Sequence, residues 1–234
     1  MRTRPTITAS DSRAKRRPAA AREAKAAPAG RREQNKQEKL ARIAAAAKAL
    51  FAAKGFAQTT TQEIAERAEI GAGTLFLYAK SKEDLLVMVF KDEMIETSRA
   101  GFERVDANAP FLDQLMYVFG AMIAYHDRDL GLARVLIREV TIPTGSERRH
   151  HIAVLMRAIY SGIGDLIRAA QRDGALRPDV DAESAAQNLF AVYYFGLIAW
   201  LSGNVTKPQL KRRLRARLSQ VIDGIAAQSG RRPA

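Results

Sequence analysis

The 234-residue sequence has no cysteine and only three histidines, so it offers few groups for redox or metal chemistry. The missing cysteine excludes disulfides, thiolate metal sites and cysteine nucleophiles. His150 and His151 are adjacent and point about 100° apart on a helix, which is poor geometry for one metal ion. Metalloprotease, Walker and serine-hydrolase motifs are also missing. The sequence therefore predicts no enzyme, no metal site and no cofactor.

Long apolar segments are scarce as well. The longest run, "LFAVYYFGLIAWL" at 189–201, is about two-thirds of the ~20 residues that a membrane span needs. The N-terminus lacks the apolar segment of a secretory signal. We expect a buried helix at 189–201, no membrane insertion and a cytoplasmic location.

The formal net charge is +13, and it is concentrated at the two ends. Residues 1–32 carry ten Lys and Arg against two acids, and residues 207–234 carry eight against one, which leaves 33–206 at −2. Basic ends favour a polyanionic partner. Two classes of function fit: a sequence-specific DNA-binding regulator, and a basic helical protein that binds nucleic acid or an anionic membrane non-specifically through its tails.

The pattern of apolar residues predicts an all-α fold, because no convincing alternating strand is present. Residues 1–31, rich in Ala, Pro and Arg, should form a disordered basic tail. A helix-turn-helix domain is expected at 32–80, a helical regulatory and dimerisation domain at 81–228, and a basic tail at 229–234. The expected helices cover about 32–54, 61–68, 72–79, 81–105, 111–126, 129–140, 146–173, 182–201 and 208–227.

Capping signals place two short helices close together after Gly55. Thr60 and Glu63 fit a capping box at the start of the first, and Ser81 with Asp84 opens the long helix that follows the second. Two short helices joined by a tight turn make a helix-turn-helix, whose second helix can enter the major groove.

Helical geometry divides the second short helix into two faces. Leu75 and Ala79 should pack inward, whereas Gly73, Thr74 and Leu77 point roughly the opposite way. Glycine at the start of this helix lets backbone N–H groups approach phosphates. Tight packing between helices is an equally simple reason for these glycines. The order and spacing of all these features together favour DNA.

The segment "ARIAAAAKALFAAKGFAQTTTQEIAERAEIGAGTLFLYAKSKEDLL", residues 41–86, resembles the N-terminal signature of the tetracycline-repressor-like (TetR) transcriptional regulators. This resemblance implies a dimer of about nine helices per chain, with a DNA-binding head, a divergent ligand-binding body and repression as the usual mode. Gly71, Ala72, Phe76 and Leu77 depart from the residues usual in the family, so phosphate and hydroxyl contacts are lost there. The candidate DNA-binding residues are Thr60, Thr61, Gly71, Ala72, Gly73, Thr74, Phe76, Leu77, Tyr78 and Lys82.

Because the head lacks those contacts, the tail before Arg32 is a candidate source of electrostatic affinity. Leu77, which points outward, is a candidate for contact with a thymine methyl group. A solvated tail without function is the competing interpretation.

The predicted partners are a double-stranded DNA operator, a second copy of the chain and a small-molecule effector. The resemblance implies dimerisation through the helices near 182–201 and 208–227, and Gly196 and Ala199 are small enough for close helix contact. Purely intramolecular packing of this region is the alternative. Met and polar-tipped aromatic residues suit a mostly apolar effector. The candidate ligand-binding residues are Met88, Met116, Phe119, Met122, Tyr125, His126, Arg134, Arg138, Tyr160, Phe190, Tyr193 and Tyr194.

Overall fold

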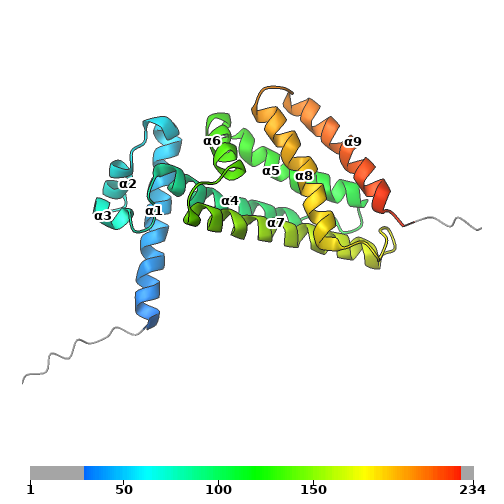
Figure 1. Ribbon diagram of the computed structural model, residues 1–234, viewed down its shortest axis with the longest axis horizontal. Helices are drawn as coiled ribbons and strands as arrows, with labels where there is room; N and C mark the ends of the chain where they lie inside the picture. The colour runs from blue at the N-terminus through cyan, green and yellow to red at the C-terminus, as the bar shows by residue number, and fades with distance from the viewer. Residues whose placement is uncertain (1–28, 228–234) are drawn as a thin grey trace, which may run out of the picture.

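The computed structural model describes residues 29–227, and within this range the regular secondary structure is helical (Figure 1). The only β feature of this range is an isolated antiparallel bridge between Leu176 and Ala226. The all-α prediction is therefore confirmed. The helices are α1 (Ala29–Gln58), α2 (Thr61–Arg67), α3 (Ala72–Leu75), α4 (Lys82–Glu103), α5 (Phe111–Asp127), α6 (Leu130–Thr141), α7 (Ser146–Arg172), α8 (Ala182–Leu201) and α9 (Lys207–Ile225).

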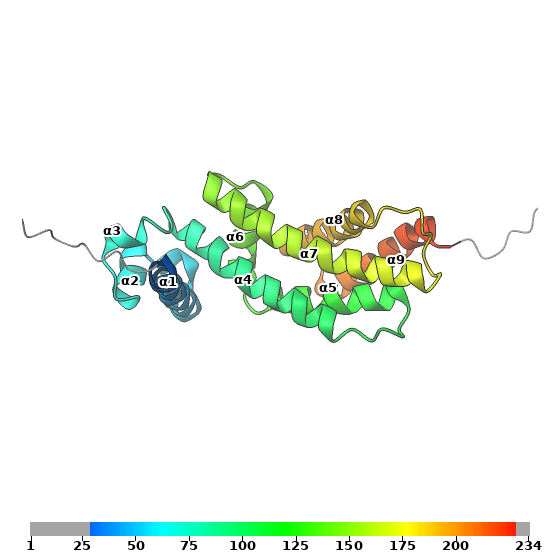
Figure 2. The ribbon, with the colours of Figure 1, turned by 90° about the horizontal axis from the view of Figure 1, so that it is seen from below.

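Helices α1 to α3 form a small head at one end of the molecule. α2 and α3 lie on the side of α1 that faces away from the other helices (Figures 1 and 2). Ile43 and Phe51 of α1 are buried with Ile64 of α2 and Leu75 of α3. Gly55 breaks α1 near its end with a φ of +80°, a backbone conformation that favours glycine.

Helices α4 to α9 form an elongated body. α4 and α7 lie side by side along it, and α8 and α9 pack together beside them (Figures 1 and 2). A Cβ atom added at Gly162 of α7 would lie 2.2 Å from the ring of Phe102 of α4, so only glycine permits this close approach. The core is apolar, and Phe119 of α5 stacks on Tyr193 of α8 with ring centroids 4.6 Å apart.

Most predicted helix limits agree with the structure to within two or three residues. Two differ more. α1 begins at Ala29, inside the segment expected to be a tail, while residues 1–28 and 228–234 of the two expected tails lie outside the described residues. α3 ends at Leu75 instead of Ala79. Its cap residue, Gly71, has no side chain to bond the first turn, and the chain continues to Ala79 through turns.

In the part of the chain that the structure describes, no helix is both long and apolar enough to cross a membrane. α8 carries the apolar run at 189–201, and Leu189, Tyr193, Leu197 and Leu201 are buried in it. The expectation of a helix there is confirmed, but only one face of it is buried, since Phe195 is 63% exposed.

Candidate functional site

A capping box fixes the start of α2. The Thr60 hydroxyl accepts from the Glu63 amide at 3.3 Å, and the Glu63 carboxylate accepts from the Thr60 amide at 2.9 Å. Lys54 of α1 forms an ion pair with the same carboxylate. The Lys54 ammonium, followed by the Thr60 hydroxyl and amide, lowers the pKa of Glu63 to about 2. The predicted capping box is confirmed, and its carboxylate also joins α2 to α1.

The turn between α2 and α3 ends α2 with a Schellman motif. The Ile70 amide donates to the Ala65 carbonyl at 3.0 Å and the Glu69 amide to the Glu66 carbonyl at 3.0 Å. Glu69 occupies the left-handed position with a φ of +54°, where glycine is the usual residue. Glu69 is the only non-glycine residue with positive φ in the described range.

α3 presents one face to the head and the other to solvent. Leu75 and Ala79 are buried, as predicted, while Phe76 and Leu77 are 48% and 83% exposed. A Cβ atom added at Gly73 would meet no heavy atom within 4 Å. Intramolecular packing therefore does not explain this glycine. We call the surface formed by exposed Gly71, Gly73, Phe76 and Leu77 and half-buried Thr74 the outer face of α3.

The remaining candidates for DNA contact surround this outer face or lie beneath it. Thr60 is exposed, and Thr61, Ala72 and Tyr78 are half-buried. Tyr78 also packs against the core of the protein. Contact of these residues with DNA stays a prediction.

Lys82, predicted to hold a phosphate, has its ammonium group on the end of α1. Its Nζ donates to the carbonyls of Phe56, Ala57 and Thr59 at 3.0, 3.1 and 3.2 Å. It also lies over the Phe56 ring, 4.5 Å from the centroid. An ammonium has three hydrogens, and three carbonyls receive them here. The side chain therefore joins the start of α4 to the end of α1.

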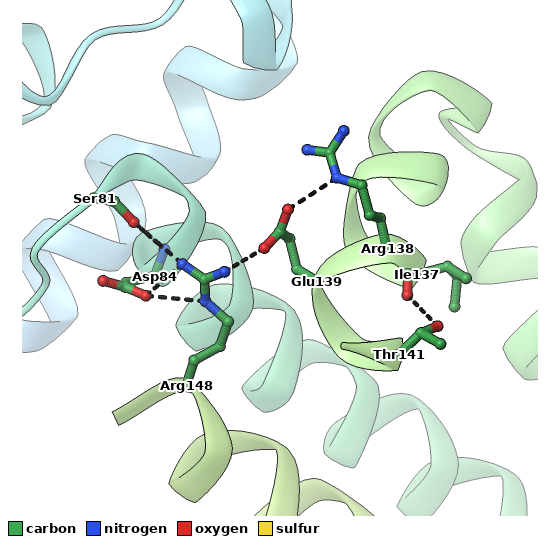
Figure 3. Close-up of polar contacts among 7 residues, drawn as sticks. All are labelled: Ser81, Asp84, Ile137, Arg138, Glu139, Thr141 and Arg148. Atoms are coloured by element: carbon green, nitrogen blue, oxygen red, sulfur yellow. Dashed lines mark hydrogen bonds and ion pairs between the residues drawn. The ribbon is translucent and has the colours of Figure 1, made fainter. Parts of the chain in front are cut away.

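A buried arginine connects the start of α4 to two other body helices (Figure 3). Arg148, at the start of α7, donates to Asp84 Oδ1 from Nε at 3.0 Å and from Nη2 at 2.8 Å. Its Nη1 pairs with Glu139 at the end of α6. The Arg148 side chain is only 8% exposed. We call Arg148, Asp84, Glu139 and the cap residue Ser81 the Arg148 cluster. Sequence reasoning missed it, because Arg148 lies in the polar stretch "SERRHH" and its partners are distant in sequence.

Five of the twelve predicted ligand-binding residues gather around a small apolar space of about 20 Å³. Its walls come from α4, α5, α6, α7 and α8, and we call it the body cluster. The hydroxyl of Tyr193 has no hydrogen-bond partner and the residue is 1% exposed. The Tyr194 hydroxyl, by contrast, lies 2.9 Å from the hydroxyl of Thr141. The lining includes Met94, Met122, His126, Leu155, Met156, Phe190, Tyr193 and Tyr194.

A second space lies between the head and the body, with a volume of about 310 Å³. It reaches from α1 to α4, α5 and α6, and we call it the junction cavity. Tyr125 and His126 line it. The Tyr125 hydroxyl donates to Glu93 Oε2 at 2.6 Å, and burial followed by this bond raises the pKa of Tyr125.

The other predicted ligand-binding residues lie elsewhere. Arg134 donates to the Leu201 carbonyl at 2.8 Å, and Arg138 pairs with Glu139 on the surface. Tyr160 lines a groove between α7 and α8. Met88 and Phe119 are buried in the core, and Met116 packs against it. Met88, Met116 and Phe119 are absent from the walls of both the body cluster and the junction cavity.

The surface of α8 and α9 combines exposed apolar and basic groups. Phe195 is 63% exposed, and the Arg217 guanidinium lies 5.9 Å from its ring centroid. A groove of about 230 Å³ runs beside it, lined in part by Val192, Ala199 and Arg213. A Cβ atom on Gly196 would lie 2.8 Å from Leu210 of α9 in the same chain. Gly196 therefore serves contact within the chain.

Residues 43–89 match a family described as "Bacterial regulatory proteins, tetR family". The fatty acid metabolism regulator protein of Bacillus subtilis (strain 168) is 25% identical over 190 residues, which are 81% of this chain and 97% of that protein. The HTH-type transcriptional repressor KstR of Mycolicibacterium smegmatis is 25% identical over 189 residues, or 76% of this chain and 84% of that protein.

Solved structures have the same fold. The FadR repressor of Thermus thermophilus, in complex with lauroyl-CoA, matches with a TM-score of 0.64 and 23% identity over 83% of this chain and 99% of that one. FadR of Bacillus subtilis, in complex with stearoyl-CoA, gives a TM-score of 0.58 and 24% identity over 79% and 98%.

The matched segment covers the head from α1 into α4, and the relatives span both head and body. The family match and the helix-turn-helix with its exposed outer face agree on one biochemical role. Residues 43–89 carry the DNA-binding segment of the tetR family of bacterial regulatory proteins, and over head and body the chain is similar to transcriptional regulators that contain it.

Proposed function

We propose that the protein represses transcription by placing the outer face of α3 in the major groove of a palindromic operator in the cytoplasm. The observation that carries the proposal is the open side of Gly73, where the backbone of a short helix is bare and no part of residues 29–227 covers it. A bare backbone at this point allows N–H groups to approach phosphate closely. Leu77, at 83% exposure, offers an apolar contact for a thymine methyl group.

The starts of α2 and α4 flank α3 and supply further contacts. Thr60 is exposed at the start of α2, but its hydroxyl already donates to Glu63 Oε2 at 2.8 Å, so a phosphate oxygen would have to displace that carboxylate. Lys82 acts in this proposal by holding the end of α1, since its ammonium hydrogens are already bonded there. The Lys82 side chain is therefore a weaker candidate for DNA contact than Thr74.

The exposed surface of α8 and α9 supports dimerisation through these helices. Phe195 and the adjoining groove form an apolar patch rimmed by arginines, which suits burial against a second copy. Two heads related by a two-fold axis can meet half-sites one helical turn, about 34–36 Å, apart.

We further propose that the effector is an acyl-CoA-like amphiphile with its hydrocarbon chain in the body cluster. The cluster is apolar except for polar tips, and the Tyr193 hydroxyl inside it lacks a partner, which costs about 1–3 kcal/mol in a buried site. A thioester carbonyl would accept a hydrogen bond from it. The two FadR structures similar to this chain are complexes with lauroyl-CoA and stearoyl-CoA, which supports the same class of effector.

The body cluster must open to admit an acyl chain, because it holds only about 20 Å³ here. α4 forms part of its wall and begins at the Arg148 cluster beside the head. Opening would therefore shift the start of α4 and the spacing of the two heads. An effector that binds the open form better shifts the population towards it.

Selection of bound sites from random duplex DNA tests the DNA part of the proposal. We expect a palindrome, and loss of specific binding of at least tenfold in Gly73→Glu, which adds a negative charge to the outer face without a clash. Gly120→Glu is the matched control, since a Cβ atom there also meets nothing within 4 Å and Gly120 lies in α5, outside the proposed DNA and dimer surfaces. Sequence-blind binding that disappears at moderate salt would instead support non-specific binding through the tails.

Titration with lauroyl-CoA tests the effector part. We expect it to release the wild-type protein from the selected operator, and we expect Tyr193→Phe to weaken this release while operator affinity stays the same. Tyr194→Phe is the control, because the hydroxyl of Tyr194 already has Thr141 as a partner. If acyl-CoA leaves operator affinity unchanged, the effector class is wrong and the DNA-binding proposal still stands.

A further inference from the structure

The junction cavity connects two parts of the molecule that must change their relation during regulation. Its walls are contributed by α1 of the head and by α4, α5 and α6 of the body. We propose that it is a second ligand site, separate from the body cluster, for an uncharged, mainly aromatic small molecule that carries one hydrogen-bonding group. This inference goes beyond the acyl-CoA effector proposed above and does not depend on it.

The size and the lining of the cavity suit such a ligand. Its volume of about 310 Å³ lies at the lower end of the ~300–1,000 Å³ usual for small-molecule sites, and such sites are common between domains. Most of the wall is apolar: Phe51, Ala52, Leu86, Val89, Phe90, Leu132, Ala133 and Leu136 line it.

The charged groups in the wall are two cations and two anions, and each already has a partner. Lys48 forms an ion pair with Glu93, whose other oxygen accepts from Tyr125. The Arg128 guanidinium lies 5.5 Å from the Tyr125 ring centroid. Asp129 caps α6 through the Leu132 amide at 2.9 Å. A charged ligand would have to displace one of these partners, whereas an uncharged ligand would not.

One buried polar atom in the wall remains unpartnered. His126 is 3% exposed, and its Nδ1 has no hydrogen-bond partner among the described residues. Burial lowers the pKa of His126 to about 4, so the imidazole is neutral near pH 7. A neutral imidazole nitrogen bonds a hydroxyl or amide of a ligand without any change in net charge.

The junction cavity and the body cluster meet at a shared wall. Phe90 and His126 line both spaces, and their ring centroids lie 5.7 Å apart. Both ligands would therefore contact these two rings, the acyl chain after the body cluster has opened. A molecule in the junction cavity contacts α1 and α4 at the same time. It would favour one arrangement of head and body, and the effect on operator binding would be reciprocal.

The test uses the full-length dimer and 2-naphthol, an uncharged fluorescent aromatic with one hydroxyl. We expect saturable binding with one site per chain. Ala52→Phe should weaken the affinity at least tenfold, because exposed Ala52 lines the cavity and a larger side chain there blocks it. Ala53→Phe is the matched control, since Ala53 is also exposed on α1 but does not line the cavity. Equal binding by both variants, with unchanged helical content, would overturn the site.

The ligand class has its own comparison. Wild-type protein should prefer 2-naphthol to naphthalene, and His126→Phe should remove this preference while naphthalene binding remains. 2-Naphthoate, of similar size but negatively charged, should bind at least tenfold more weakly than 2-naphthol. Tighter binding of 2-naphthoate, or an unchanged preference in His126→Phe, would overturn the proposed chemistry.

Lauroyl-CoA separates the two sites. With separate sites, the apparent Kd for 2-naphthol reaches a plateau at saturating lauroyl-CoA, whereas competition for one site raises it without limit and overturns the proposal. If lauroyl-CoA does not bind at all, only the proposed acyl-CoA effector fails. The comparison of Ala52→Phe with Ala53→Phe then still decides whether the junction cavity binds a ligand.

Discussion

The head and the body of this regulator are stabilised in different ways. The head consists of one long and two short helices whose ends are fixed by polar contacts: the Thr60–Glu63 box, the Lys54–Glu63 pair and the three carbonyl bonds of Lys82. The body consists of long helices joined mainly by apolar side chains such as Phe119 and Tyr193. Short helices are marginal by themselves, so the head depends on its caps. The body depends on close packing between helices that are distant in sequence.

The largest loss of stability is expected from the body. Phe119→Ala removes a fully buried ring that stacks on Tyr193, and we expect it to lower the free energy of unfolding by about 3–5 kcal/mol. Chemical denaturation at fixed protein concentration measures this loss. Tyr117→Ala is the control, because Tyr117 lies on the same helix and is 50% exposed. Equal losses for the two variants would contradict the assignment of the core.

A variant at Arg148 tests how the start of α4, the first body helix after the head, is held in place. Arg148→Met nearly keeps the side-chain volume but leaves the Asp84 carboxylate buried without a cation and Glu139 with Arg138 alone, at a cost of about 3–5 kcal/mol. We expect it also to reduce the effect of the effector on operator affinity. Arg149→Met, next to it and exposed, should change neither quantity. Wild-type coupling in a folded Arg148→Met variant would show that the cluster has a structural role alone.

His126 gives the body a pH dependence of its own. Burial lowers the folded-state pKa to about 4, below the ordinary value of 6.5. The imidazole is neutral in both states above pH 6.5, and the unfolded state takes up its proton first as the pH falls. Stability is therefore lost between pH 6.5 and about 4, by roughly 3 kcal/mol in total. The difference in unfolding free energy between wild type and His126→Phe, measured across this range, should show this slope. A difference independent of pH would contradict it.

In the head, the capping box should be worth less than a core ring. Thr60→Ala removes the hydroxyl that accepts from the Glu63 amide, and we expect a loss of about 1 kcal/mol. Hydrogen exchange of α2 amides resolves this change from unfolding of the body. Thr144→Ala, in an exposed loop that precedes α7, serves as the control. Unchanged exchange of α2 in Thr60→Ala would mean that tertiary packing, and not the cap, holds this helix.

The smallest effect has the opposite sign. Glu69 has a φ of +54° in the turn of the head, and Glu69→Gly removes a steric cost there. The gain is limited by the greater freedom of glycine in the unfolded chain, so we expect stabilisation of less than about 1 kcal/mol. Thermal unfolding measures it, and a lower melting temperature would show that Glu69 makes compensating contacts.

The sequence predicted most of this fold because the deciding signals are local. Apolar periodicity gave the helices, and the pattern of Thr60 and Glu63 gave the capping box, within four residues of chain. Burial of Leu75 and Ala79 followed from helical geometry. The end of α3 was placed too late, because periodicity cannot reveal that an uncapped helix gives way to turns after one turn.

The parts that could not be predicted rest on contacts between distant residues. Arg148 meets Asp84 across 64 positions, and Lys82 meets Phe56 across 26. In the sequence, both look like ordinary surface cations. The junction cavity is defined by four helices together, so no single stretch carries a sign of it.

The ammonium of Lys82 has a consequence for how a signal reaches DNA. Because it joins the first residue of α4 to the carbonyls at the end of α1, these two segments cannot separate without breaking three hydrogen bonds at once. A displacement of α4 would therefore rotate the whole head as a rigid body. The outer face of α3 would keep its internal geometry. Affinity for the operator would then be controlled by the distance between two intact reading heads, and each head would keep its sequence preference in both states.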